Sequence, residues 1–363
     1  MAVEKLSLST MNFYAPRFEI KIQNNKLPQI MSNSISAVSV EETMNAGATF
    51  SITVNDEFDM EAQEFTWLDH QLFNVGNIVE ISIGYESNLL SLVKGNITSL
   101  EPSFFAGETP TITIRGQDLS YDFMKRRSPA RTFANESYTE IARKIAKEAG
   151  LTIDAGKTRK KKEPVCKQSN ESYFSFLAKL AKEVDFHVWL DGKTIYFKKP
   201  EDDKKEIMTL ELGKDIISFR PNMNTAKLYG EVEVKGYDPR NPSRPIIGKA
   251  VAGSERLQES GRQTASQIAQ ARHGRSKKVI TDVVVRSVTH ANSIARAVLN
   301  SASDRFIEGD VDCIGIPQIR PNACIRLEKM GKRFSGKYYV KSTTHTIDNS
   351  GYRTRFTVKR NAS

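Results

Sequence analysis

Alternation of apolar and polar side chains is strongest near the end of the chain, between Asn322 and Asn361. Three segments there, 323–328, 336–345 and 352–360, place apolar residues at every second position. Turns rich in Asn, Asp and Gly separate them, and these residue types supply the positive φ angles that tight reversals need. Period-two alternation with Val, Ile, Tyr, Phe and Thr is typical of half-buried antiparallel strands. The pattern predicts a three-stranded meander.

Residues 75–116 contain a second series of three alternating segments. At a constant offset of about 244 residues, the apolar positions of the two series coincide, and Ile112 and Ile114, for example, fall on Phe356 and Val358. This coincidence indicates an internal repeat, whose period is far too long for a solenoid. Any two antiparallel meanders could align this well, so the elements that precede each meander decide the interpretation.

Similar elements precede both meanders. The expected strands are 18–22, 35–41 and 49–55 in the first block, and 207–212, 216–219, 230–235 and 279–286 in the second. A short helix is expected over 65–73, and a longer one begins near Thr289 and ends at Glu308–Asp310. The repeated order of strands, helix and meander favours a duplicated antiparallel barrel over a chance alignment.

Helical periodicity enters between the two blocks. Ser137–Glu140 forms a capping box that predicts the start of a helix. A second helix is expected from Ser169 or Asn170 to residue 184, with apolar residues at intervals of three and four. A hairpin with a Gly-containing turn follows it. This stretch therefore reads as a small α+β domain.

The predicted class is α+β and mainly β, with two antiparallel β-barrel domains and a small α+β domain inserted between them. The first barrel spans 1–116, with a tail at 1–12, the small domain spans 117–205, and the second barrel spans 206–363. Within the second barrel, the polar, basic stretch 250–278 is expected to be a mobile arm with at most a short helix.

The net charge of +10 raises nucleic acid as a partner. Most of the charge is diffuse, and the one dense run, Lys157–Lys162, is typical of a solvated loop. Aromatic residues do not alternate with it, and no helix-turn-helix or zinc-finger spacing occurs. A nucleic-acid-binding or other basic interaction protein therefore stays as an alternative, and no specific nucleic acid is expected as a partner.

Candidate chemistry is sparse. The three cysteines form no C-x-x-C pair, and no two of the five histidines lie at H-x-x-H or H-x-x-x-H spacing. The phosphate-loop and G-x-S-x-G patterns are absent. The sequence therefore identifies no catalytic, cofactor-binding or metal-binding residue, and the protein is expected not to be an enzyme. No segment approaches the roughly 18 apolar residues of a membrane span, and the N-terminus lacks the apolar core of a signal peptide.

Four short segments carry a resemblance to a known family. Residues 168–181 resemble the central domain of late control gene D proteins, and 232–239 resemble the start of their second barrel. Residues 315–321 and 334–340, with His345, resemble its close. These proteins, with the N-terminal part of VgrG proteins, are baseplate hubs of contractile phage tails, pyocin-like particles and related injection systems. The resemblance covers nearly the whole chain, and the order of the segments makes it fairly specific.

The resemblance implies two tube-like barrels per chain and a homotrimer, in which six barrels form a pseudo-sixfold ring. Such a ring adapts a sixfold inner tube, or a tube-initiator protein, above it to a threefold spike below it. Because the sequence ends at Ser363, directly after the second barrel, the spike is expected to be a separate polypeptide, and other baseplate components are further partners.

The same resemblance implies synthesis in the bacterial cytoplasm, without a signal peptide or membrane insertion, and incorporation into a virion or phage tail-like particle. A cell-wall-degrading tail enzyme is a weaker alternative, because it would need a carboxylic acid of raised pKa in a cleft, and no residue marks one.

Overall fold

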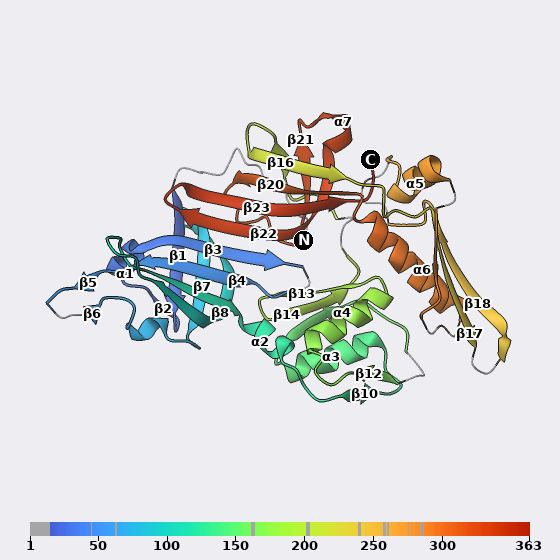
Figure 1. Cartoon of the computed structure of the whole chain (residues 1–363), viewed down its shortest axis with the longest axis horizontal. Coiled ribbons are helices and arrows are strands. Elements are labelled where there is room, and N and C mark those ends of the chain that lie inside the picture. The colour runs from blue at the N-terminus through green and yellow to red at the C-terminus, as the bar shows by residue number, and fades with distance from the viewer. Residues whose placement is uncertain are drawn as a thin grey trace.

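A computed structural model describes residues 15–363, except 45, 62–63, 161–163, 201–203, 239–240, 257–258, 260, 275, 284 and 286. The predicted class is confirmed, because strands dominate and the large sheets are antiparallel. In Figure 1 the β-rich second half (red) lies above the first half (blue), a smaller unit with helices lies at the lower centre and a blade of strands lies at the right end.

The first half is an antiparallel sheet in the order β3-β4-β9-β8-β7-β1. Its elements are β1 (Pro16–Ile22), β2 (Asn25–Lys26), α1 (Gln29–Asn33), β3 (Ile35–Thr43), β4 (Thr49–Asn55), β5 (Phe58–Asp59), β6 (Glu64–Phe65), β7 (Ile78–Tyr85), β8 (Asn88–Ser103) and β9 (Thr111–Asp118). Alternation places Val38, Ile52 and Ile114 on one face, where each is fully buried. The expected strands are present, whereas the helix expected over 65–73 is reduced to a 3-10 turn at Gln71–Phe73.

The central unit follows directly. Its elements are α2 (Leu119–Lys125), β10 (Arg131–Phe133), α3 (Tyr138–Glu148), β11 (Thr152–Ala155), β12 (Val165–Lys167), α4 (Tyr173–Glu183), β13 (His187–Asp191) and β14 (Thr194–Lys198). The predicted capping box is present: the hydroxyl of Ser137 accepts from the N–H of Glu140, whose carboxylate accepts from the N–H of Ser137 at 2.7 Å. In the basic run, Lys160 is exposed and lies 3.6 Å from Glu140. Residues 161–163 lie outside the described residues.

The second central helix, α4, begins later than predicted. Its N-cap is Ser172, whose hydroxyl accepts from the N–H of Ser175. Asn170 cannot take that role, because its φ of 66° lies in the left-handed region rather than in the extended conformation of an N-cap. The predicted buried face is correct, and Leu177 is fully buried in the core of this unit.

The second half is a sheet in the order β16-β20-β23-β22-β21-β15. Its elements are β15 (Thr209–Glu211), β16 (Ile216–Met223), β20 (Ile307–Ile314), β21 (Cys324–Glu328), α7 (Gly331–Phe334), β22 (Gly336–Asp348) and β23 (Gly351–Arg360). The C-terminal meander is therefore present as predicted. The helix end expected at Glu308–Asp310 is wrong, because these residues lie inside β20 and pair with β23.

A blade of strands is inserted between β16 and β20. It contains β17 (Glu231–Asp238), β18 (Asn241–Val251), α5 (Ala265–His273), β19 (Lys277–Ile280) and α6 (Val288–Ser303). The sheet runs in the order β18-β17-β19. Helix α6 covers one of its faces, and Val232 of β17 and Ala291 and Leu299 of α6 are fully buried there. Of the strand expected over 279–286, β19 contains only the first two residues, and residues 281–283 are not in a strand. Residues 284 and 286 lie outside the described residues.

The stretch 250–278, expected to be a mobile arm with at most a short helix, contains the short helix α5. Thr264 caps α5 with a second capping box, which uses Gln267. Ala265 and Ala269 are fully buried against the core of the second half. The mobility of the stretch stays a prediction. Residues 257–258, 260 and 275 of the expected arm lie outside the described residues.

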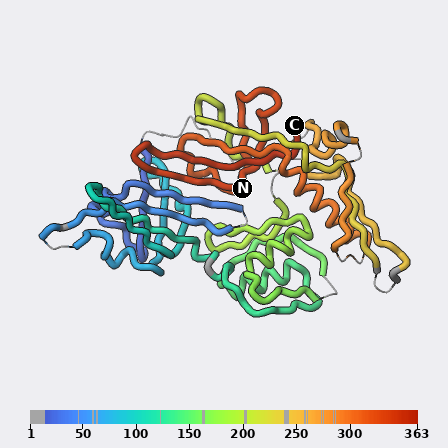
Figure 2. Tube along the Cα trace, in the orientation of Figure 1, coloured from blue at the N-terminus to red at the C-terminus, as the bar shows by residue number. Residues whose placement is uncertain are grey.

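The two halves share one sheet. β22 pairs antiparallel with β3, from Ser342 opposite Thr43 to Asp348 opposite Ala37. The strands near the C-terminus therefore lie directly beside the first strands of the chain, as the colours of Figure 2 show. Within the described residues, no helix has the length and apolar character needed to cross a membrane. The division into domains at 116 and 205 stays a prediction.

Candidate assembly interface

A continuous polar surface runs across both halves. The strand path β16-β20-β23-β22-β3-β4-β9-β8 crosses eight strands of the described part of the chain, and one face of each strand points into a core. The opposite face carries hydroxyl and charged side chains in aligned rows, such as Arg115, Ser51, Ser39, Thr346 and Arg353. This face is an extended hydrophilic wall.

Several charges on this wall are paired with one another. The guanidinium groups of Arg353 and Arg355 lie 3.8 Å and 3.6 Å from Asp312. Lys341 lies 2.8 Å from Glu308. Since these three cations already face carboxylates, they do not form the unopposed row of cations that binds a phosphate backbone.

The wall is built from two copies of one pattern. In strand order, β3, β4, β9, β8 and β7 of the first half correspond to β16, β20, β23, β22 and β21 of the second, with antiparallel pairing throughout. The repeat ends at the next strand, because β1 runs antiparallel to β7 whereas β15 runs parallel to β21.

Two β-bulges occur at corresponding places in the halves. One bulge inserts Ser36 into β3 and Ile217 into β16, and the other inserts Thr98 into β8 and Lys341 into β22. A bulge is a specific local feature that fixes register. Matching bulges on both strands make chance similarity of two meanders a poor explanation, and they define which residues of the two halves are equivalent.

The tip of the β22–β23 hairpin seals the joint between the halves. Ile347 and Tyr352, close to the turn of this hairpin, are buried in the core of the first half. The ring of Tyr352 lies 5.6 Å from that of Tyr85, and the hydroxyl of Tyr85 donates to the carbonyl of Gly315 at 2.8 Å. The joint therefore consists of buried apolar side chains with hydrogen bonding at its edge.

His345 lies at the centre of this joint and is fully buried. Its Nε2 donates to the carbonyl of Ile319 at 3.0 Å, so Nδ1 is the acceptor that faces the hydroxyls of Tyr352 at 2.9 Å and Thr354 at 3.1 Å. Burial lowers the pKa of His345 to about 4. The histidine is therefore a neutral structural residue at pH 7.

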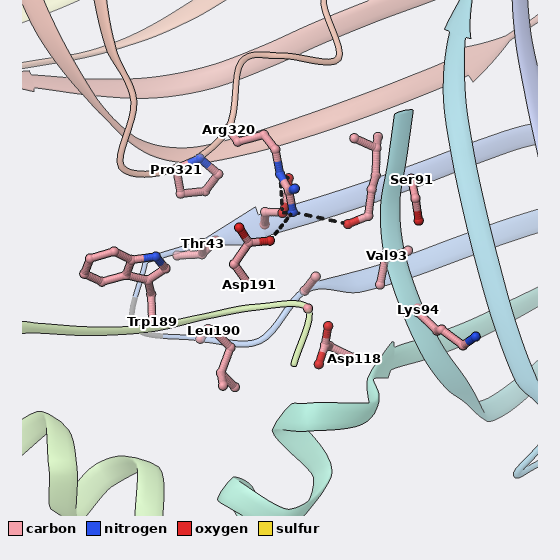
Figure 3. Close-up of a pocket in the computed structure, with 15 residues that line it drawn as sticks. Thr43, Ser91, Val93, Lys94, Asp118, Trp189, Leu190, Asp191, Arg320 and Pro321 are labelled. Atoms are coloured by element: carbon pink, nitrogen blue, oxygen red, sulfur yellow. Dashed lines mark hydrogen bonds and ion pairs between the residues drawn. The ribbon is translucent and has the colours of Figure 1, made fainter. Parts of the chain in front are cut away.

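Arg320 connects all three parts of the molecule, as Figure 3 shows. Its guanidinium makes two contacts of 3.1 Å from Nε to Glu42 of β3, and Nη2 also bonds Glu42. Nη2 lies 3.2 Å from Asp191 of the central unit and 3.5 Å from the carbonyl of Leu92 in β8. A pocket of about 160 Å³ opens beside these groups.

The carboxylates around this pocket already have structural partners. Burial raises the pKa of the Glu42 carboxyl, against the opposing effect of Arg320. Burial also raises the pKa of Asp118, which caps α2 by accepting from the N–H of Ser120 at 2.7 Å. The pocket therefore lies at a three-way joint, and its charged groups hold that joint together.

The sequence identifies no functional side chains, and none with evident chemistry is added in the part of the chain that the structure describes. Within the described residues, no group of three His, Cys, Asp or Glu side chains is placed to hold a metal ion. The cysteines are free, with Cys313 and Cys324 buried and Cys166 exposed. Sequence reasoning missed the Glu42–Arg320 pair, because 278 residues separate its members. Arg320 lies in the segment 315–321 that carries the resemblance, but nothing in that segment points to Glu42 as its partner.

Residues 14–349 match the model of a family described as the Alg8 N-terminal domain. The sequence matches none of the curated proteins.

Solved structures share the fold at low sequence identity. The 43 kDa tail protein of prophage MuSo2 from Shewanella oneidensis superposes with a TM-score of 0.73, 14% identity and coverage of 95% of this chain and 98% of that chain. A tail protein from Neisseria meningitidis MC58 gives 0.70, 11% identity and coverage of 96% and 97%. The E. coli c3393 protein, described as a type VI secretion component similar to T4 bacteriophage tail proteins gp27 and gp5, gives 0.56, 13% identity and coverage of 95% and 77%.

Proposed function

We propose that the protein is a structural hub in the baseplate of a contractile tail or injection system. The chain belongs to the Alg8 N-terminal domain family, and it shares its fold with phage tail proteins. In this role it forms a homotrimeric ring between a sixfold inner tube and a threefold spike. It has no enzymatic activity of its own, and other baseplate components contact its outer surface.

The observation that carries this proposal is the duplicated wall. Each chain contributes two similar four-stranded units, β16-β20-β23-β22 and β3-β4-β9-β8, already joined edge to edge. Three chains arranged about a threefold axis would present six such units. A ring of this kind offers near-sixfold symmetry to a tube and true threefold symmetry to a spike.

The chemistry of the wall supports its use as a bore. Its side chains are hydroxyls and charges of both signs, several of them paired, so the surface is well hydrated without a strong field of either sign. The alternative of a nucleic-acid-binding protein finds no support in this surface, despite the net charge of the chain.

Mass photometry of the purified protein, alone and co-purified with a spike expressed from a neighbouring gene, tests the proposal. The expected mass is about three times the 40.8 kDa of one chain, and the ring should appear in at least the co-purified sample, because obligate oligomers often assemble only with a partner. Class averages of the particles should show near-sixfold symmetry. Monomers in both samples would contradict the hub function.

A further inference from the structure

The wall of one chain ends in two strand edges. In the duplicated pattern, these edges are the counterparts of the edges of β22 and β3 that pair inside the chain. At one end, the outer edge of β16 has no partner strand within the described residues. At the other end, β7 covers β8 only up to Asn96, so the segment from Thr98 to Ser103 has an open edge. Exposed edges of this kind are normally paired or protected.

The internal joint shows how such edges fit together. β22 pairs through its first part with β21 and through its last part with β3. β8 and β16 correspond to β22 and β3 in the duplicated pattern. We infer that the open edge of β8 pairs antiparallel with β16 of a second copy of this chain, in the register that β22 and β3 use within the chain.

The bulges fix this register to the residue. Thr346 lies five residues after the bulge at Lys341 and faces Ser39, which lies three residues after the bulge at Ser36. The two side chains touch, with oxygen atoms 3.2 Å apart. Five residues after the bulge at Thr98 lies Ser103, and three residues after the bulge at Ile217 lies Arg220. In the inferred register these two residues therefore face each other across the interface between copies.

This register brings like surfaces together. In this register Leu100 and Pro102 of β8, with Phe104 directly after it, would face Met223, Pro221 and Phe219 of β16, in the same order. A shift of one residue would turn these side chains toward the polar wall. The cores of neighbouring chains would then be continuous across the interface, as the cores of the two halves are within one chain.

Each of the two edges contains a proline. Proline has no N–H, so each one removes a donor from the ladder toward which its backbone nitrogen points. In the inferred register Pro102 and Pro221 lie opposite each other, and both missing donors fall on one pair of residues. A shift of two residues would place them on two separate pairs, so the number of missing donors is the same and the register rests on the bulges. Out of register, the prolines protect both edges against indiscriminate pairing.

The exposed hairpin tip gives independent support. Ile347, near the tip of the β22–β23 hairpin, is only 7% exposed because it enters the core of the first half. Its counterpart near the tip of the β8–β9 hairpin is Phe104, which is 55% exposed, and the adjacent Phe105 is 66% exposed. An aromatic side chain in this position is a typical interface anchor. We expect Phe104 to pack against Phe219 of the neighbouring chain.

Cysteine pairs test the register directly. The inference rests on the proposed trimer, so both are measured on the same samples, in a background with Cys166→Ser that removes the exposed thiol. Opposite residues of antiparallel strands have Cα atoms about 4.5–5.5 Å apart, within reach of a disulfide. Ser103→Cys with Arg220→Cys should therefore link chains into covalent trimers on mild oxidation.

Two matched pairs serve as controls. Ser39→Cys with Thr346→Cys should form a disulfide within one chain, because these positions are in contact. Ser103→Cys with Asn222→Cys, displaced by two residues on the same face, should link at least about tenfold less, because its Cα atoms exceed the roughly 7 Å limit. Trimers by mass photometry without the 103–220 link, or with equal linking of 103–222, overturn the inference and leave the hub function standing. Monomers in every preparation overturn the hub function itself.

A second variant keeps the test decisive if the cysteines impair assembly. Phe104→Ser should weaken the trimer, because it removes an interface anchor. The protein concentration below which the trimer dissociates should rise by about tenfold or more. Val288→Ser is the matched control: Val288 is 54% exposed, but it lies in the inserted blade, away from both edges. Equal trimer stability in both variants would overturn the inference.

Discussion

The joint between the halves and the polar wall both contain arginine–glutamate pairs, but in opposite surroundings. Arg320 and Glu42 meet inside the joint, where Glu42 is 8% exposed. Arg115 and Glu101 meet on the wall at 2.8 Å, and both side chains are about half exposed, at 53% and 51%. Both pairs join a guanidinium to a carboxylate, but they differ in burial and in the further contacts that Arg320 makes to Asp191 and to the Leu92 carbonyl.

Burial turns the first pair into a constraint on geometry. A charge removed from water must keep its partner, so Glu42 fixes the position of Arg320, and Arg320 fixes the second half and Asp191 of the central unit against it. Water can solvate either member of the exposed pair if the other moves away. The joint is therefore fixed in one arrangement, whereas the wall keeps its hydration and imposes little on the fold.

The largest effect is expected from breaking the buried pair. Arg320→Ala should lower the free energy of unfolding by roughly 3–5 kcal/mol, because it leaves the Glu42 carboxylate buried without a partner. Arg115→Ala, the matched change on the wall, should cost less than about 1 kcal/mol. Urea denaturation of both variants measures the difference.

A double variant separates the cost of the stranded charge from the value of the contact. Glu42→Gln combined with Arg320→Ala should be more stable than Arg320→Ala alone, because the remaining group carries no charge. Equal losses for Arg320→Ala and Arg115→Ala would show that the joint does not depend on this pair.

The joint should also respond to pH through His345. Its pKa of about 4 in the folded protein lies below the ordinary value of 6.5. The unfolded chain therefore takes up a proton first as pH falls, and the stability that His345 confers at pH 7 is lost progressively between about pH 6.5 and pH 4. The loss is on the order of 3 kcal/mol when complete.

His345→Gln tests this response, since Gln can still donate to the carbonyl of Ile319 but does not titrate. The variant should be less stable than the parent at pH 7, and the gap should narrow as pH falls to 5. Buried His187, whose pKa burial lowers to about 3, is present in both proteins and cancels in the comparison. A gap that stays constant from pH 7 to pH 5 would contradict the assignment.

The sequence was a good guide to the strands and to the face that each strand buries. It also found the duplication, but with a register error of two residues. Aligned on the bulge at Thr98 and Lys341, Ile114 corresponds to Phe356, whereas the constant offset of 244 placed it on Val358. Strand periodicity is two, so the error left every side chain on the correct face. Alternation alone cannot reveal such a shift, and bulges are not visible in sequence.

The joint was beyond sequence reasoning for a different reason. The contact between β22 and β3 joins residues some 300 positions apart, and alternation says nothing about which strand edges meet. The inserted blade caused a similar error. It separates β16 from β20 in the sequence, whereas their counterparts β3 and β4 are adjacent. The helical pattern of α6 was extended into β20, so that strand was not predicted. Pairing of distant edges depends on the closed three-dimensional arrangement.

The smallest effect is expected on the wall itself, at Arg355. Its side chain is 71% exposed and shares Asp312 with Arg353, which lies at 3.8 Å. Arg355→Gln should therefore change the free energy of unfolding by less than about 0.5 kcal/mol, because the carboxylate keeps a cation beside it and water solvates the rest. Thermal melts and mass photometry should show an unchanged Tm and an unchanged trimer. If the variant instead lost the trimer, the wall would be a contact surface between copies rather than the lining of a hydrated bore, and its difference from the buried joint would disappear.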